Sequence, residues 1–125
     1  VYDCGSCLYP QADEAIMRDT IDKQPERDLR TFSIPLSSIK VNGRKINYFD
    51  FISSLENADC NKALKRILPK INMDAIFRIV DETPFISDLQ KQFYKTMLRT
   101  RKERILDFAM EKLRKREKAK ELEAR

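Results

Sequence analysis

The sequence predicts a mainly α-helical fold, a helical bundle with one long C-terminal helix and a small β-hairpin near residues 38–47. Three observations support this fold class. Apolar residues recur every three or four positions over most of residues 48–113, as on one face of a helix. The stretch from residue 85 to residue 113 contains neither glycine nor proline. An Asn42-Gly43 pair separates two short segments that contain isoleucine or valine.

The N-terminal part of the sequence predicts little regular structure. Residues 1–12 are expected to form a loop, and residues 13–22 a short helix whose first turn is capped by Asp13. Residues 23–30 are polar and contain a proline, so they are expected to form a surface loop. Residues 31–36 are of the types found in strands, but a second proline interrupts them.

The pair Asn42-Gly43 marks the turn of the predicted hairpin. Residues 38–41 precede it and residues 44–47 follow it. Asparagine and glycine adopt the positive φ angles of a type I′ turn, which matches the twist of two antiparallel strands. The alternative is a tight loop that leads directly into a helix.

Three short helices are predicted after the hairpin. Apolar residues three apart indicate a helix over about residues 48–56. Asp59 is expected to cap a second helix, which ends near Pro69, and Asn72 is expected to cap a third.

The last and longest helix is predicted to begin at Thr83, because Pro84 would then occupy the favoured first helical position. Its apolar positions continue to Leu113, over about 30 residues, and the charged end would extend it to about 40. We expect about the last dozen residues to fray or to form a charged helix in solvent. The phenylalanines on the predicted helices are core candidates: Phe49, Phe51, Phe77, Phe85, Phe93 and Phe108.

Positive charge is concentrated at the C-terminal end. Residues 95–125 contain 12 basic and 6 acidic side chains, a net charge of +6, whereas residues 1–94 contain 13 and 14, a net charge of −1. A basic helix can bind nucleic-acid phosphates, but a solvated helix end is favoured because acidic residues are interspersed. Four residues form a basic cluster: Arg99, Arg101, Lys102 and Arg104. Helical spacing places Arg101 near Arg104 and the other two on a different face, so the cluster is not one stripe.

Composition excludes several classes of site. The sequence has no histidine, which removes serine–histidine and cysteine–histidine nucleophile pairs and most catalytic zinc sites. Its two glycines, Gly5 and Gly43, cannot form a glycine-rich phosphate loop. No apolar run approaches the roughly 20 residues needed to cross a bilayer, and no signal peptide is visible. We therefore expect a cytoplasmic protein without a membrane partner, and the start at Val1 suggests a fragment of a longer chain.

The three cysteines are Cys4, Cys7 and Cys60. Cys4 and Cys7 have the spacing of a redox pair or of half a zinc site. A closed zinc site needs two more ligands, and Cys60 is the one remaining cysteine in a sequence without histidine. The residues after Cys7 do not predict the helix that a thioredoxin-like redox pair requires. We therefore favour ordinary reduced thiols, as expected in a reducing compartment.

Three pairs of carboxylates lie close together in the sequence: Asp13/Glu14, Asp81/Glu82 and Glu121/Glu123. Two carboxylates can perform acid–base catalysis when their surroundings separate their pKa values. These pairs are predicted at helix ends or in the charged tail, where they would be exposed. We therefore do not expect them to be catalytic.

A short motif at the N-terminus points to a metal ligand. Asp3-Cys4-Gly5 has the form Asp-x-Gly, in which the aspartate of protein kinases coordinates the Mg²⁺ that bridges ATP phosphates. A carboxylate oxygen suits this hard cation, and Gly5 lets the chain turn directly after the ligand. By itself the triplet is common in ordinary turns, and the sequence contains no glycine-rich loop or kinase catalytic loop.

Residues 1–10 resemble the segment that follows the catalytic loop in HipA-like kinases. Residues 41–52 and 81–88 are also similar to stretches of one bacterial subgroup of that family. The resemblance implies the C-terminal, largely helical lobe of a bilobal serine/threonine kinase, with Asp3 as the Mg²⁺ ligand. It also implies that the nucleotide-binding lysine, the general base and the second metal ligand precede Val1. We therefore expect no catalytic residue within this chain.

The resemblance divides the chain into residues 1–31, a metal-ligand loop with a short helix, and residues 32–125, a helical region with an N-terminal hairpin. Both would belong to one domain or to part of one. The resemblance implies that the intact protein uses Mg²⁺ and ATP to phosphorylate a protein and, as in toxin–antitoxin systems, binds an antitoxin. The isolated chain is expected to be inactive and to hold no cofactor. We expect the protein to bind nucleic acid only through a partner, or weakly through the basic C-terminal helix.

Two alternative functions are consistent with the sequence. A non-catalytic helical module would bind nucleic acid or a protein through its basic C-terminal helix, and its nucleic-acid binding would depend steeply on salt. A thiol or metal protein would instead use Cys4 and Cys7.

Overall fold

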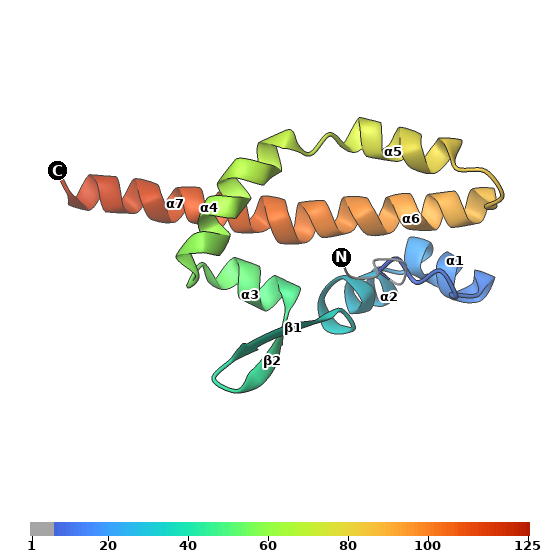
Figure 1. Ribbon diagram of the computed structural model, residues 1–125, viewed down its shortest axis with the longest axis horizontal. Helices are drawn as coiled ribbons and strands as arrows, with labels where there is room; N and C mark the ends of the chain where they lie inside the picture. The colour runs from blue at the N-terminus through green and yellow to red at the C-terminus, as the bar shows by residue number, and fades with distance from the viewer. Residues whose placement is uncertain (1–6) are drawn as a thin grey trace.

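One long helix runs the length of the molecule, and the shorter helices lie beside it or cross it (Figure 1). In the computed structural model, which describes residues 7–125, this helix is continuous from α6 (Asp88–Arg101) through the π-helical turn η3 (Lys102–Asp107) to α7 (Phe108–Glu123). The strands in this part of the chain form one two-stranded hairpin. The predicted fold, mainly α with a long C-terminal helix and a small hairpin, is therefore confirmed.

The long helix begins later than the sequence predicts. Thr83 does not cap it; its backbone N–H instead donates to the Val80 carbonyl at the end of α5 (Met73–Glu82). Ser87 is the N-cap: its hydroxyl accepts the Gln90 N–H at 3.1 Å, and the Gln90 side-chain oxygen accepts the Ser87 N–H at 2.9 Å. This capping box satisfies two backbone donors that have no partner within the helix, and it sets the helix start at Asp88.

Phe85 lies in the turn before the long helix and not in the core. Its backbone φ is +66°, and its side chain is fully exposed. The prediction that Phe85 belongs to the core is therefore wrong, because its segment is not helical. Of the other candidates, Phe93 is fully buried and Phe108 is about half exposed. The remaining three are partly buried: Phe49, Phe51 and Phe77.

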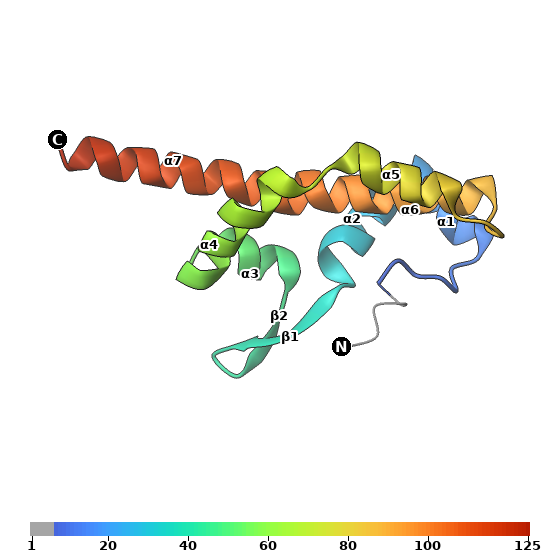
Figure 2. The same ribbon diagram turned by 45° about the horizontal axis from the view of Figure 1, so that its top comes forward.

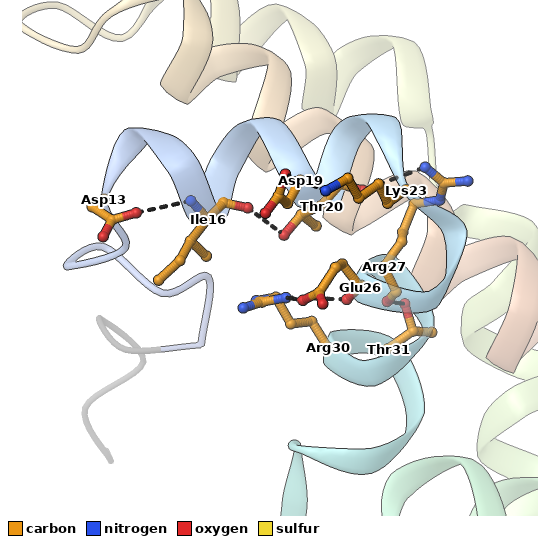
Figure 3. Close-up of polar contacts among 9 residues, drawn as sticks. All are labelled: Asp13, Ile16, Asp19, Thr20, Lys23, Glu26, Arg27, Arg30 and Thr31. Atoms are coloured by element: carbon orange, nitrogen blue, oxygen red, sulfur yellow. Dashed lines mark hydrogen bonds and ion pairs between the residues drawn. The ribbon is translucent and has the colours of Figure 1, made fainter.

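The predicted N-terminal helix is confirmed, and a second helix follows it in place of the predicted loop. α1 (Glu14–Asp22) begins after Asp13, whose carboxylate accepts a backbone N–H at 2.8 Å (Figure 3). α2 (Gln24–Asp28) and the π-helical turn η1 (Leu29–Ser33) occupy the segment for which the sequence predicts a loop and interrupted strand-like residues. Pro25 does not prevent this helix, because it lies in the first turn, where its missing N–H would have no intrahelical partner.

The hairpin has the predicted turn. β1 (Leu36–Val41) and β2 (Arg44–Asn47) pair antiparallel, with one register irregularity in β1. Asn42 and Gly43 connect them with φ angles of +54° and +79°, as a type I′ turn requires. The hairpin projects away from the helices in both views (Figure 2), so it contributes little to the packing of the helical body.

Three short helices follow the hairpin: α3 (Tyr48–Ser54), α4 (Ala58–Ile67) and α5, with a single 3-10 turn, η2 (Leu68–Lys70), between the last two. Each begins after an asparagine whose side-chain oxygen accepts a backbone N–H; these residues are Asn47, Asn57 and Asn72. The predicted cap at Asn72 is confirmed. The predicted cap at Asp59 is wrong: Asp59 lies in the first turn of α4, where its charge is favourable near the positive end of the helix dipole.

Two apolar clusters hold the shorter helices on the long helix. The first joins α1 to α6 and consists of Met17, Phe93 and Met97. The second joins α4 to α7 and consists of Leu64, Ala109 and Met110. These side chains are at most 6% exposed. Removal of apolar surface from water at these two places is the main force that keeps the short helices docked.

Polar contacts from α7 hold the corner between α3 and α4. Leu55 ends α3 with a φ of +61°, and its carbonyl accepts N–H groups of Asn61 at 2.9 Å and of Arg116 at 3.1 Å. Lys112, one turn earlier on α7, donates to the Ser53 carbonyl at 2.7 Å. These bonds satisfy carbonyls at the C-terminal end of α3 that have no partner within that helix.

The charged end of α7 is helical to Glu123, beyond the buried Leu113. On this end Lys115 pairs with Glu111, one turn away, at 3.1 Å. Of the two predicted possibilities, the charged helix is therefore the one observed. None of the helices described in residues 7–125 combines the length and the apolar composition that a bilayer crossing requires.

Ser87→Ala is expected to lower the free energy of unfolding by about 1 kcal/mol, because it removes the N-cap of the long helix. Thr83→Ala is the matched control: Thr83 donates its hydroxyl to the Ile79 carbonyl at 2.7 Å in an exposed position, and its loss should cost no more than about 0.5 kcal/mol. Urea denaturation followed by circular dichroism measures both values. A larger loss for Thr83→Ala would contradict the assigned start of the helix.

Candidate functional site

The predicted Mg²⁺ ligand Asp3 and the first cysteine of the C-G-S-C stretch, Cys4, lie outside the described residues. The described chain begins at Cys7, four residues after Asp3 in the sequence. The contacts of the following residues therefore define where the N-terminal segment joins the helical body.

Arg101, at the end of α6, joins three separate parts of the chain. Its guanidinium donates to the Cys7 carbonyl at 2.8 Å and to the Arg30 carbonyl at 3.3 Å. The guanidinium carbon also lies 5.8 Å from the centre of the Tyr9 ring, within the range of a cation–π contact. We refer to these four residues as the Arg101 junction. It connects the N-terminal segment and η1 to the middle of the long helix.

The N-terminal side of the Arg101 junction is a tight turn packed on the first apolar cluster. Tyr9 has a φ of +52°, and its carbonyl accepts the Ala12 N–H at 3.0 Å. Leu8, Tyr9 and Ala12 all pack against the cluster of Met17, Phe93 and Met97. Apolar packing and the arginine contacts therefore hold the same short segment.

The Arg30 side of the junction is fixed by its own polar contacts, which Figure 3 shows. The Arg30 guanidinium donates to the Glu26 carbonyl at 3.1 Å and to its carboxylate at 3.0 Å. Thr31, which is buried, donates its hydroxyl to the Arg27 carbonyl at 2.8 Å. The Arg27 guanidinium in turn donates to the Ile21 carbonyl at the end of α1, at 2.6 Å. The backbone of η1 is thereby set in place as an acceptor for Arg101.

An apolar groove of about 620 Å³ lies next to the junction, between α3, α5 and the long helix. Most of its lining is apolar and includes Ile52, Ile71, Met73, Ile76, Leu98 and Ile105. Arg101 and Lys102 also line it, and among residues 7–125 no carboxylate does. Arg101 Nε is buried without a hydrogen-bond partner among the described residues, whereas Lys102 donates to Asp107 at 3.1 Å. The described side chains give the groove apolar surface and positive charge, but no pair of groups for acid–base catalysis.

The basic cluster is divided differently from the prediction. Arg101 and Lys102 face the apolar groove, whereas Arg99 and Arg104 line a second, polar groove of about 710 Å³. Arg101 and Arg104 therefore line different grooves, and the four residues do not form one stripe.

Most of the basic residues in the polar groove already have partners. Arg27 donates to α1 carbonyls, and Lys95 pairs with Asp81 at 2.8 Å. The guanidinium carbon of Arg104 lies 5.4 Å from the centre of the Phe32 ring. Asp28 and Glu103 also line this groove, so its charge is mixed. The arrangement is that of a solvated, internally paired surface and not of a phosphate-binding platform.

Within residues 7–125, no three side chains of histidine, cysteine, aspartate or glutamate come together in a way that could hold a metal ion. A carboxylate such as that of Asp3 has the oxygen chemistry that Mg²⁺ prefers. One carboxylate is nevertheless far from a complete ligand set, so a Mg²⁺ ion at Asp3 would take its other ligands from the nucleotide, water or other protein residues.

Comparison with known proteins adds a clear relationship. No protein-family model matches the chain. Over 110 residues, or 87% of its length, the chain is 46% identical to the serine/threonine-protein kinase CtkA of Helicobacter pylori. Its fold also matches the crystal structure of a Helicobacter pylori proinflammatory kinase CtkA, with a TM-score of 0.83, 44% identity and 90% of this chain covered.

The chain resembles part of a serine/threonine kinase. It spans 34% of the length of the curated relative and 40% of the chain in the solved structure. The sequence-based expectation of a kinase-related chain is therefore confirmed at this level.

The described cysteines do not form a redox or metal site with each other. Cys7 is exposed beside the apolar groove, and Cys60 lies partly buried on α4; both are free thiols. Burial raises the pKa of the Cys60 thiol, which favours its protonated, less reactive form. Because Cys4 lies outside the described residues, a role of the Cys4 and Cys7 pair stays a prediction.

The carboxylate pairs have structural contacts at the surface. Asp13 caps α1, and Glu14 lies 3.6 Å from Arg18. Asp81 pairs with Lys95. The other members are exposed: Glu82, Glu121 and Glu123. All six carboxylates are exposed, so their positions give no support for acid–base catalysis by a pair.

Sequence reasoning did not find the Arg101 junction. Arg101 is recognisable in the sequence as a member of a basic cluster, but its partners are backbone carbonyls, 94 and 71 residues away. Every residue carries such a carbonyl, so no side-chain pattern marks the acceptors.

In the Cys4→Ser/Cys7→Ser variant, Cys60 is the one remaining thiol. We expect its alkylation by iodoacetamide to reach half of its maximal rate at a higher pH in the folded protein than in urea, because burial raises the pKa of the folded-state thiol. Mass spectrometry over a pH series gives both midpoints. A folded-state midpoint at or below the unfolded one would show that burial does not control this thiol.

Proposed function

We propose that this chain is the C-terminal helical part of a serine/threonine protein kinase and that the intact kinase transfers a phosphoryl group from ATP to a protein. The observation that carries the proposal is the match to kinase CtkA, with 46% sequence identity and, for the fold, a TM-score of 0.83. Similarity at this level over about nine-tenths of the chain supports a common fold and a common place in a larger protein.

Asp3 is the residue of this chain that would touch the reacting nucleotide. In the intact kinase its carboxylate would bind Mg²⁺, which neutralises charge on the ATP phosphates during transfer. The nucleotide-binding lysine, the general base and the second metal ligand would come from other parts of the protein. The helical body described here would support the N-terminal segment and hold it against the rest of the kinase.

We assign the kinase to the HipA-like type and propose an antitoxin as its partner and the cytoplasm as its location. The support is the resemblance of residues 1–10, 41–52 and 81–88 to that family. Residues 41–52 include β2 and most of α3, and residues 81–88 include the end of α5, the turn after it and the first residue of α6. Both stretches lie largely at the surface, where a partner protein could reach them.

The alternative, a binding module that uses its basic C-terminal helix, has less support. Lys112 and Arg116 donate to backbone carbonyls of the α3–α4 corner. Elsewhere on α7, Glu117 pairs with Lys65 and Glu111 with Lys115. Several charges of this helix therefore serve the fold, and acidic groups dilute the rest, which disfavours tight binding to a nucleic-acid backbone.

The decisive experiment uses Asp3→Ala in the intact kinase. We expect Mg²⁺-dependent ATP turnover to fall by about 10²-fold or more, because a charge-stabilising ligand at the transferring phosphate is lost. Steady-state ATP hydrolysis and protein phosphorylation measure the effect.

Asp13→Asn is the matched control for Asp3→Ala, since asparagine also caps helices well and α1 should be preserved. Its turnover should match that of the unmodified kinase. Unchanged turnover in Asp3→Ala would remove the metal-ligand role and, with it, the kinase alignment of the N-terminal segment.

A further inference from the structure

We propose that the turn between α5 and α6 is a docking site for a different protein, with Phe85 as the anchor that enters an apolar pocket with a basic rim on that partner. The turn comprises residues 83–87, between the end of α5 and the start of α6. The inference needs only this turn and is tested by stability and binding, so it stands or falls separately from the proposed phosphoryl transfer.

Phe85 has a backbone conformation that its surroundings in the described fold do not reward. Four residues other than glycine have a positive φ in the described part of the chain: Tyr9, Asn42, Leu55 and Phe85. Asparagine adopts this conformation readily, Leu55 is buried, and Tyr9 packs against the first apolar cluster. Phe85, with a φ of +66°, is instead fully exposed. Strain at a residue that contributes nothing to packing points to a function of that residue.

The turn is held in place from both sides. Lys91 of α6 donates to the Asp81 carbonyl in the last turn of α5, at 2.7 Å. On the other side, the capping box of Ser87 fixes the start of α6. Ile86 is partly buried, so the turn covers one apolar side chain and leaves its neighbour Phe85 in solvent. A turn that is already ordered loses little conformational entropy when a partner binds it.

The charged groups beside Phe85 define the chemistry of the partner. Glu82 precedes it by three residues and Asp88 follows it by three. Both side chains are exposed, and neither has an ion pair or a hydrogen bond within residues 7–125. Glu82 ends α5, where the helix dipole disfavours negative charge, and the last turn of that helix has no basic residue. Basic groups of a partner would therefore find two unpaired carboxylates beside an exposed aromatic ring.

This combination favours a protein over a nucleic acid or an anionic membrane. The carboxylates repel phosphate groups, which both of those surfaces carry. An aromatic ring that is buried in a pocket is a typical anchor of protein interfaces, and complementary charges around it add specificity. The turn lies at one end of the molecule in both views, where a partner can approach it (Figures 1 and 2).

A second copy of this chain is a poorer match than a different protein. The apolar groove between α3, α5 and the long helix is lined by two basic residues, Arg101 and Lys102. Both already have acceptors: Arg101 donates to two backbone carbonyls, and Lys102 donates to Asp107. These positive charges are therefore not available to pair with Glu82 and Asp88 of another copy.

Phe85→Gly in the intact protein separates a binding role from a structural one. Glycine adopts a positive φ without the steric conflict of a larger residue, and the exposed ring that it removes has no packing to lose. We expect the midpoint of thermal unfolding, measured by differential scanning fluorimetry, to stay unchanged or to rise. A lower midpoint would show that Phe85 stabilises the fold, and it would overturn the inference.

A photo-crosslinker identifies what contacts the turn. The residue p-benzoylphenylalanine replaces Phe85 in the intact protein in cells, and mass spectrometry identifies the adducts. The control places the same residue at Leu122, which is 60% exposed near the C-terminal end of α7. We expect an adduct with a different protein from position 85 and not from position 122. No adduct, or adducts only within the chain or with a second copy, would overturn the inference.

The adduct alone does not establish an anchor, so the captured protein is purified and its affinity for the intact protein is measured by calorimetry. We expect Phe85→Gly to weaken binding by about 30-fold or more, as for a residue that dominates an interface. Glu82→Gln should weaken it less and reduce its salt dependence, and Leu122→Ala should leave it unchanged. An affinity that Phe85→Gly leaves intact, or that Leu122→Ala lowers equally, would overturn the anchor. Unchanged affinity in Glu82→Gln would overturn the basic rim.

Discussion

The structure depends on the burial of one face of the continuous helix formed by α6, η3 and α7. The other helices of the described chain have 5 to 10 residues, and helices of this length are marginal in water without tertiary contacts. They are stable here because they cover the apolar side chains of the long helix. Phe93 and Met97 are covered on the α1 side, and Ala109 and Met110 on the α4 side. The long helix is therefore the common surface on which two otherwise separate groups of helices are assembled.

Apolar burial holds helices together but does not fix their relative orientation. Three cationic side chains of the long helix help to fix it through hydrogen bonds. Arg101, Lys112 and Arg116 each donate to backbone carbonyls at places where the chain changes direction. Carbonyls at such places lack the partners that a helix or strand would provide, so a charged donor there is worth more than an exposed ion pair. These two arginines and one lysine help to explain the C-terminal excess of basic residues, part of which serves intramolecular contacts and not an external ligand.

The sequence revealed those features that depend on neighbouring residues. The cap at Asp13, the cap at Asn72 and the Asn42-Gly43 turn were predictable because each needs only a few adjacent side chains. Two local signals competed before the long helix, and Ser87 prevailed over Thr83 because its capping box with Gln90 makes two hydrogen bonds. Pro25 was misread as a helix breaker because proline also suits the first turn of a helix. The candidate site was harder: Asp3 came from a family resemblance, while the Arg101 junction joins backbone groups that no pattern of side chains marks.

In phosphoryl transfer a protein contributes mainly positions and charges, since the nucleotide and metal carry most of the chemistry. On the proposed function, the described helical body would support the N-terminal segment through its contacts with residues 7–12. Leu8 and Tyr9 pack against the cluster of Met17, Phe93 and Met97, so core packing and the hydrogen bond from Arg101 restrain one stretch of backbone from two sides. The two restraints differ in kind: the cluster resists displacement in any direction, whereas the hydrogen bond fixes the orientation of one peptide group. Loosening the core would therefore shift residues 7–12 as a whole. Loss of the Arg101 guanidinium would leave these residues in contact with the helical body, but the peptide group of Cys7 would be free to rotate.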